Sequence, residues 1–201
     1  MLNAFSVNGT FYTLFIDPLL AGIRKEVASL VGPGESVIDI ACGTGALSLT
    51  LARHAGHVTG LDLSEDMVRT ARRKAERRKL DNTSFEVHDV TDLSVHPSGR
   101  FDVAVTSMAM HPFDRAEAVK VLSEMKRIAR RVIVADYACP MPPGPAAMVA
   151  WGIECLASGD HYRNFKVYMK DRGLTGLAET AGLGISRVQT RGFGVLVVVQ
   201  T

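Results

Sequence analysis

Short apolar runs alternate along this chain with amphipathic segments, and this alternation constrains the fold more than any other feature. The apolar runs predict seven strands, at 36–41, 57–62, 83–89, 101–108, 131–137, 185–193 and 194–201. Strands that alternate with helical segments are typical of a parallel sheet with helices on both faces. The last two runs meet with no room for a crossover helix, so they must pair antiparallel. We therefore expect an α/β three-layer sandwich whose mostly parallel, seven-stranded sheet ends in a C-terminal antiparallel hairpin.

Capping residues predict where two of the helices begin. Ser64 precedes an amphipathic run that extends to Leu80. Asp114 lies three residues before Glu117, which is the spacing of a capping box. A shorter helix is expected over 45–55.

The length of 201 residues suits one domain with a sizeable core, which we take as 1–201. Within it we expect an N-terminal helical segment at 1–32. Residues 138–184 are too many for one crossover helix, so we expect a helical insertion there that closes over the substrate. Its part at 144–172 is either a moving lid or a fixed cover.

The composition indicates a soluble, cytoplasmic protein. A formal charge of +2 gives no sign of a nucleic-acid partner, and nowhere do about 18 apolar residues run uninterrupted, so no integral membrane segment is expected. No secretory signal is recognised at the N-terminus. Cys42, Cys139 and Cys155 form no CxxC pair, which argues against a disulfide framework and fits a reducing compartment.

Three carboxylates and a glycine loop predict a ligand site at one edge of the sheet. Asp39 ends the first strand and is followed by a turn of small residues that let a ligand approach the main chain. Asp62 ends the second strand and Asp89 the third. Unpaired acids beside a core are costly, so we interpret the three as contacts to one extended nucleoside.

Four stretches carry a family resemblance: "VIDIACGTG" (37–45), "VTGLDLSEDMV" (58–68), "FEVHDVTDL" (85–93) and "FDVAVTSMAMH" (101–111). In this order they resemble the class I S-adenosylmethionine (SAM) dependent methyltransferases, in particular the ubiquinone/menaquinone-biosynthesis group. The resemblance covers about residues 35–137. It implies a Rossmann-like sheet of order 3-2-1-4-5-7-6, SAM as cofactor and S-adenosylhomocysteine as product.

The resemblance also implies which residues bind SAM. Asp62 would hold the ribose, Asp89 would read the adenine edge, and Thr106 would lie under the methionine moiety. Ala41 stands where many relatives have glycine, a small enough change to keep the contact. The full set implied is Asp39, Ala41, Cys42, Gly43, Gly45, Asp62, Leu63, Met67, Asp89, Val90 and Thr106.

His111, Tyr137 and His161 are the candidate catalytic residues. His111 follows the fourth strand, where a neutral imidazole could accept a proton near pH 7. A structural histidine is the alternative. The six histidines are scattered, with no pair at metal-ligand spacing beside carboxylates, so the sequence predicts no metal.

A small-molecule methyl acceptor is expected. No Asn/Asp-Pro-Pro-aromatic run of the kind that binds planar amines follows the fourth strand. The apolar run at 146–157, with the N-terminal stretch, would suit a quinone-like or lipid-like acceptor. It could equally be core or a homodimer contact.

Two other functions stay open from the residues. One is a SAM-binding regulatory or interaction protein without turnover. The other is a nicotinamide-dependent dehydrogenase, because "GTGALS" matches half of a GxGxxG fingerprint.

Overall fold

A single seven-stranded sheet runs through the molecule in the order β3-β2-β1-β4-β5-β7-β6. The structure is a computed structural model that describes residues 20–157 and 159–201. The strands are β1 (Ser36–Ile40), β2 (His57–Asp62), β3 (Thr83–Val87), β4 (Phe101–Ser107), β5 (Ala129–Tyr137), β6 (Arg187–Arg191) and β7 (Leu196–Gln200). Order and strand positions confirm the prediction.

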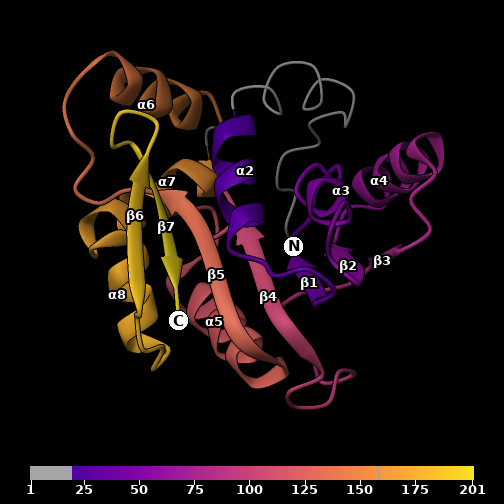
Figure 1. Cartoon of the computed structure of the whole chain (residues 1–201). Coiled ribbons are helices and arrows are strands. Elements are labelled where there is room, and N and C mark those ends of the chain that lie inside the picture. The colour runs from indigo at the N-terminus through magenta and orange to yellow at the C-terminus, as the bar shows by residue number, and fades with distance from the viewer. Residues whose placement is uncertain (1–19, 158) are drawn as a thin grey trace.

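The first five strands pair parallel, and β7 pairs antiparallel with both β5 and β6. The β6–β7 pair is the hairpin expected from the sequence. Because the parallel strands share one direction, their carboxyl ends lie together at one edge of the sheet, the upper edge in Figure 1. That edge is where open α/β sheets bind ligands.

Helices cover both faces of the sheet, as a three-layer sandwich requires (Figure 1). Ile23, Val27 and Leu51 pack against β1, β2 and β4 on one face, whereas Leu122 and Leu177 belong to the core of the other. The helices are α2 (Ala21–Ser29), α3 (Ser48–Leu51), α4 (Glu65–Arg78), α5 (Arg115–Ile128), α6 (Pro145–Ala157), α7 (Gly159–Lys170) and α8 (Gly173–Thr180).

The two predicted caps are present. The Ser64 hydroxyl accepts a hydrogen bond from the Met67 N–H at 3.4 Å and caps α4. The Asp114 carboxylate accepts one from the Glu117 N–H at 2.9 Å and caps α5. The helix expected over 45–55 is regular only over the four residues of α3, and turns continue it on either side.

The two predicted helical segments differ in how much of each lies within the described residues. Of the N-terminal segment at 1–32, α2 is helical and residues 1–19 lie outside the described residues. The insertion at 138–184 contains α6, α7 and α8. Within residues 20–157 and 159–201, no helix has both the length and the apolar character needed to cross a membrane.

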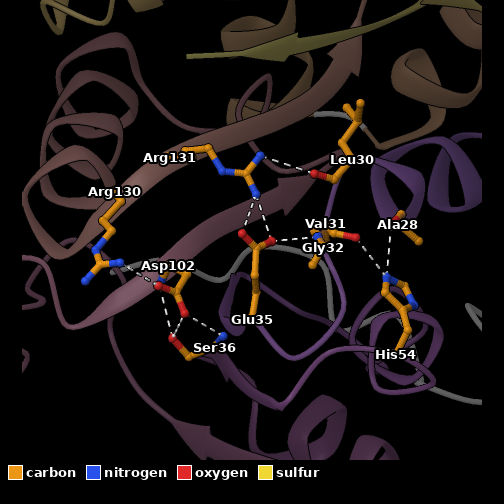
Figure 2. A network of polar contacts seen from close by, with 10 residues as sticks. All are labelled: Ala28, Leu30, Val31, Gly32, Glu35, Ser36, His54, Asp102, Arg130 and Arg131. Carbon is orange, nitrogen blue, oxygen red and sulfur yellow. Dashed lines mark hydrogen bonds and ion pairs between the residues drawn. The ribbon is translucent and has the colours of Figure 1, made fainter.

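A polar network joins the amino ends of the strands, at the edge opposite their carboxyl ends (Figure 2). Arg131 of β5 donates two hydrogen bonds to the Glu35 carboxylate, at 2.7 and 2.8 Å. Asp102 of β4 accepts from the Ser36 N–H and hydroxyl and pairs with Arg130. Such charge-assisted contacts between β1, β4 and β5 fix this edge, so we assign the network a structural role.

Candidate functional site

A cavity of about 570 Å³ opens at the carboxyl ends of β1, β2 and β4. This volume lies within the range of small-molecule sites, about 300–1,000 Å³. Nine of the eleven residues that the sequence assigned to the cofactor line it: Asp39, Ala41, Cys42, Gly43, Asp62, Leu63, Met67, Asp89 and Val90. Gly45 and Thr106 do not.

The loop after β1 leaves its cavity side free of side chains. Ala41 and Gly43 have φ of +57° and +54°, in the left-handed region. A Cβ added to Gly43 would meet nothing within 4 Å. A ligand can therefore approach the main chain at this point.

Gly45 lies where neighbouring elements come close to the loop. A Cβ there would lie 2.8 Å from the Ala71 Cβ and 3.0 Å from the Phe85 ring. The lack of a side chain at Gly45 thus lets α4 and β3 pack against the loop, and the residue does not line the cavity.

Asp62 holds the glycine loop in place. One carboxylate oxygen accepts from the Gly43 N–H at 2.8 Å, and the other from the Ser64 N–H at 2.9 Å. Each carboxylate oxygen has a second lone pair, so Asp62 can still accept hydrogen bonds from the cavity. Burial raises the pKa of Asp62, although both hydrogen bonds favour the charged form.

Asp39 is buried at the bottom of the cavity and accepts a hydrogen bond from the Ser48 hydroxyl at 2.5 Å. Burial raises the pKa of Asp39 to about 7, and the nearby charge of Asp62 adds to the rise, while Ser48 opposes it. A cation in the cavity would favour the ionised carboxylate.

Asp89 is exposed and ionised more readily than usual. One of its oxygens accepts from the Thr91 N–H and hydroxyl, at 2.9 and 2.8 Å. These bonds lower the pKa of Asp89. The three acids thus offer acceptors at three points along one cavity.

Ser107, and not Thr106, faces the cavity from β4. Thr106 is fully buried, and its hydroxyl has no hydrogen-bond partner among the described residues. Successive side chains of a strand point to opposite faces, so Thr106 and Ser107 point different ways, and the place of Thr106 under the methionine moiety stays a prediction.

The three predicted catalytic residues meet in a buried polar cluster with Asp136 and Glu154. The His111 Nδ1 lies 2.6 Å from an Asp136 oxygen, and its Nε2 lies 3.5 Å from Glu154 Oε1. Tyr137 donates to Glu154 Oε1 at 2.9 Å, and the His161 Nε2 lies 2.7 Å from Glu154 Oε2. None of these five residues lines the cavity.

Opposite charges dominate this cluster. Burial lowers the pKa of His111, but the Asp136 and Glu154 carboxylates outweigh burial and raise it to about 9. Burial raises the pKa of Glu154, and hydrogen bonds from His111, His161 and Tyr137 reverse the shift and lower it well below its usual range. His111 is therefore protonated at neutral pH in this arrangement.

Glu154 is the member of the cluster that the sequence analysis missed. It is the only carboxylate in the apolar run at 146–157 and is buried. A single acid in an otherwise apolar helix was the available signal, since a buried carboxylate needs partners.

The wall between cavity and cluster is the loop after β4. Pro112 and Phe113 line the cavity, and the Pro112 carbonyl accepts a hydrogen bond from Asn164 of α7 at 2.9 Å. No described residue of α6 or α7 lines the cavity itself. Closure of the segment at 144–172 over the substrate stays a prediction.

The part of the chain that forms the cavity also matches a known family. Residues 37–131, from β1 to the start of β5, match the model of a methyltransferase domain. These residues form the domain of a class I SAM-dependent methyltransferase. Its cofactor is SAM, which this class shares, and the dehydrogenase alternative falls away.

Two curated relatives of this methyltransferase differ in how far they align. The ubiquinone biosynthesis O-methyltransferase of Xanthomonas axonopodis pv. citri is 28% identical over 174 residues, 83% of this chain and 70% of that protein. The 23S rRNA (uracil(1939)-C(5))-methyltransferase of Acinetobacter baumannii is 38% identical over 105 residues, 47% of this chain but 23% of that protein.

A solved structure supports the fold of this methyltransferase. The magnesium protoporphyrin IX methyltransferase of Synechocystis PCC 6803, crystallised with S-adenosylhomocysteine, superposes with a TM-score of 0.66 at 22% identity. The match covers 92% of this chain and 82% of that one. The shared feature is the class I methyltransferase fold.

Proposed function

We propose that this methyltransferase transfers the methyl group of SAM to a small-molecule acceptor with an apolar body, of the quinone-like or lipid-like class. The observation that carries the proposal is the lining of the cavity beyond the three acids. Met108, Ala109, Pro112 and Phe113 form an apolar wall there. An apolar acceptor gains free energy when it leaves water for such a wall.

The charge of the cavity also favours this class over nucleic acid. Among the described lining residues, Arg24 is the one cation, whereas Asp39, Asp62, Asp89 and Glu117 are acids. A phosphate backbone would be repelled by this excess of carboxylates, since nucleic-acid sites are strongly positive. SAM carries a positive charge on its sulfur, which these carboxylates attract.

We place the cofactor along the three acids. Asp62 would accept from the ribose hydroxyls, Asp89 and the Val90 N–H would meet the adenine edge, and Asp39 would pair with the methionine amine. Leu63 and Met67 would flank the adenine. The open loop at Ala41–Gly43 supports this placement, because the methionine part can then contact the main chain.

The main contribution of the protein to methyl transfer is to align the acceptor with the methyl group of SAM. SAM supplies an already activated methyl group, and the protein holds the acceptor in line with it and excludes water. The apolar wall would do both.

We propose that His111, Tyr137 and His161 act by positioning that wall. Both ring nitrogens of His111 lie against carboxylates, so it could accept a substrate proton only after leaving them. His111→Asn should then lower turnover with little change in the pH profile of kcat. Loss of an ionisation from that profile would instead indicate a general base.

The cysteines bear on the cellular compartment, and the exposed face of α6 bears on the oligomeric state. No disulfide joins Cys42, Cys139 and Cys155 in the described structure, which supports a cytoplasmic location. Met148, Val149 and Leu156 of α6 are exposed and would form the contact if the protein is a homodimer. Light scattering with Leu156→Glu tests that contact.

An S-adenosylhomocysteine release assay tests the proposed acceptor class. The purified chain would be offered a reduced short-chain quinone, a hydroxylated fatty acid and protein-free 23S rRNA. We expect release with at least one apolar compound and none with RNA. Release with RNA alone would overturn the acceptor class, and SAM binding without turnover across a broad metabolite panel would favour a regulatory protein.

A further inference from the structure

Three side chains from three segments of the chain direct metal-ligating atoms toward one another. They are His111 in the loop after β4, Glu154 in α6 and His161 in α7. One ligand atom from each lies within 4.8 Å of the other two. His111 and Glu154 are buried, and the His161 side chain is 25% exposed, which leaves a path for an ion to enter.

We propose that His111, Glu154 and His161 form a binding site for a divalent transition-metal ion of the zinc class. Two imidazoles and one carboxylate are a ligand set that zinc and its neighbours favour, with a fourth position left for water. The proposal concerns the metal alone and does not depend on which acceptor is methylated.

The spacing of the ligands suits such an ion. Ligands at about 2.1 Å from a tetrahedral ion lie about 3.4 Å apart. The His111 Nε2 and Glu154 Oε1 are 3.5 Å apart. The His161 Nε2 is 2.7 Å from the other carboxylate oxygen, Glu154 Oε2. One atom from each residue lies within 4.8 Å of the other two, so side-chain shifts of about 1 Å would bring all three to the tetrahedral spacing.

Groups around the three ligands hold them in orientation. The Asp136 carboxylate, 2.6 Å from the His111 Nδ1, fixes the ring so that Nε2 points to Glu154. Tyr137 donates to the Glu154 carboxylate at 2.9 Å. Carboxylate–histidine pairs and hydrogen-bonded carboxylates of this kind surround metal ions in proteins and strengthen their binding.

The charges of the cluster balance with an ion in place. Asp136 and Glu154 together carry two negative charges when ionised, and two neutral imidazoles add none. One divalent cation neutralises them, whereas without it protons on the histidines must do so. Metal binding therefore competes with protons, as at other histidine sites.

Such an ion would tie α6 and α7 to the carboxyl ends of β4 and β5. His111 directly precedes Pro112 and Phe113 in the cavity wall. The ion would thus restrict the motion of the cavity wall and of α6 and α7 relative to the sheet.

Cobalt(II) titration of the metal-free full-length chain tests the site. Tetrahedral cobalt(II) absorbs visible light far more strongly than the hydrated ion, so the spectrum reports both binding and geometry. We expect one cobalt per chain, displaced by zinc. Glu154→Gln and His161→Ala should each weaken cobalt binding by at least about 100-fold, since even residues behind the ligands contribute about 10–100-fold.

His57→Ala is the matched control, because His57 is an exposed histidine on β2 that contacts Ser84 and no carboxylate of the cluster. It should bind cobalt like the unmodified chain. Circular dichroism of the metal-free variants establishes that they are folded.

No tetrahedral cobalt spectrum in the unmodified chain would overturn the proposal and leave a hydrogen-bonded cluster. A spectrum that persists in a folded Glu154→Gln, His161→Ala double variant would overturn it as well. Loss of the spectrum in His57→Ala alone would place the ion elsewhere.

Discussion

Asp62 links the glycine loop to the proposed ribose contact. Asp62→Ala removes an acceptor for the ribose, and a hydrogen bond to a charged group contributes about 1.5–3 kcal/mol, or about 10- to 100-fold in affinity. We expect calorimetry to show SAM binding weakened by that factor. Unchanged affinity in a variant with a normal melting curve would contradict the ribose role.

Asp62→Asn distinguishes the support that Asp62 gives the glycine loop from its proposed contact with the ribose. The amide oxygen can still accept from the Gly43 or the Ser64 N–H, so the loop loses less support than in the alanine variant. Its SAM affinity should fall between those of the unmodified chain and Asp62→Ala.

The raised pKa of Asp39 predicts a proton released on cofactor binding. At pH 6 much of the Asp39 population is protonated, because its pKa is about 7. The positive charge of SAM favours the carboxylate, so binding should expel the proton at pH 6 and release almost none at pH 8.5. Calorimetry at pH 6 in buffers of different ionisation enthalpy measures this release, and Asp39→Asn should abolish it. Equal heats in all buffers would contradict the pairing.

The raised pKa of Asp39 also makes the free energy of unfolding depend on pH. The folded state keeps the Asp39 proton up to about pH 7, whereas the unfolded chain loses it near pH 4. The contribution of this group to the free energy of unfolding is therefore fully present below pH 4 and is lost as pH rises through 7. Bound SAM should offset part of that loss.

Single residues were predictable where the same residue type recurs at equivalent positions, as aspartate does after three successive strands. Three acids at three strand ends predicted the three that line the cavity. Gly45 and Ser107 were not predictable to this precision, because helix packing and strand register decide which way a residue faces. Glu154 was missed because its partners come from the sheet and another helix.

The Asp114 cap shows how one side chain fixes an element that borders the cavity. It accepts from the Glu117 N–H at the start of α5. Asp114→Ala should lower the free energy of unfolding by about 1 kcal/mol, within a range of about 0.5–2. Urea denaturation measures the change, and Asp114→Asn, which also caps well, is the control. Equal losses in the two variants would show that the cap does not stabilise α5.

Elements with a strong local signal were predictable, and their contacts across the fold were not. The seven apolar runs predicted seven strands, and the tight turn predicted the antiparallel hairpin. The sequence also predicted a helical insertion after β5. Its periodicity could not show that α6 and α7 turn Glu154 and His161 toward His111, because α6 is apolar on most of its surface.

The chain as a unit divides its polar groups between the two edges of the sheet. Ion pairs at the amino ends join β1, β4 and β5, whereas carboxylates at the carboxyl ends face a cavity (Figure 2 shows the former). Parallel strand order produces this division, since it gathers the loop after each strand at one edge. A stable scaffold thus positions a loop cluster for SAM.

SAM calorimetry on a pair of glycine variants tests the placement of the cofactor. Gly43 and Gly99 both have positive φ, +54° and +65°, and at both an added Cβ meets open space. Valine should strain the backbone similarly at each, by about 1–2 kcal/mol. Only Gly43 lines the cavity. We predict that the unmodified chain and Gly99→Val bind SAM alike and that folded Gly43→Val binds none; SAM binding by Gly43→Val equal to that of Gly99→Val would contradict the site.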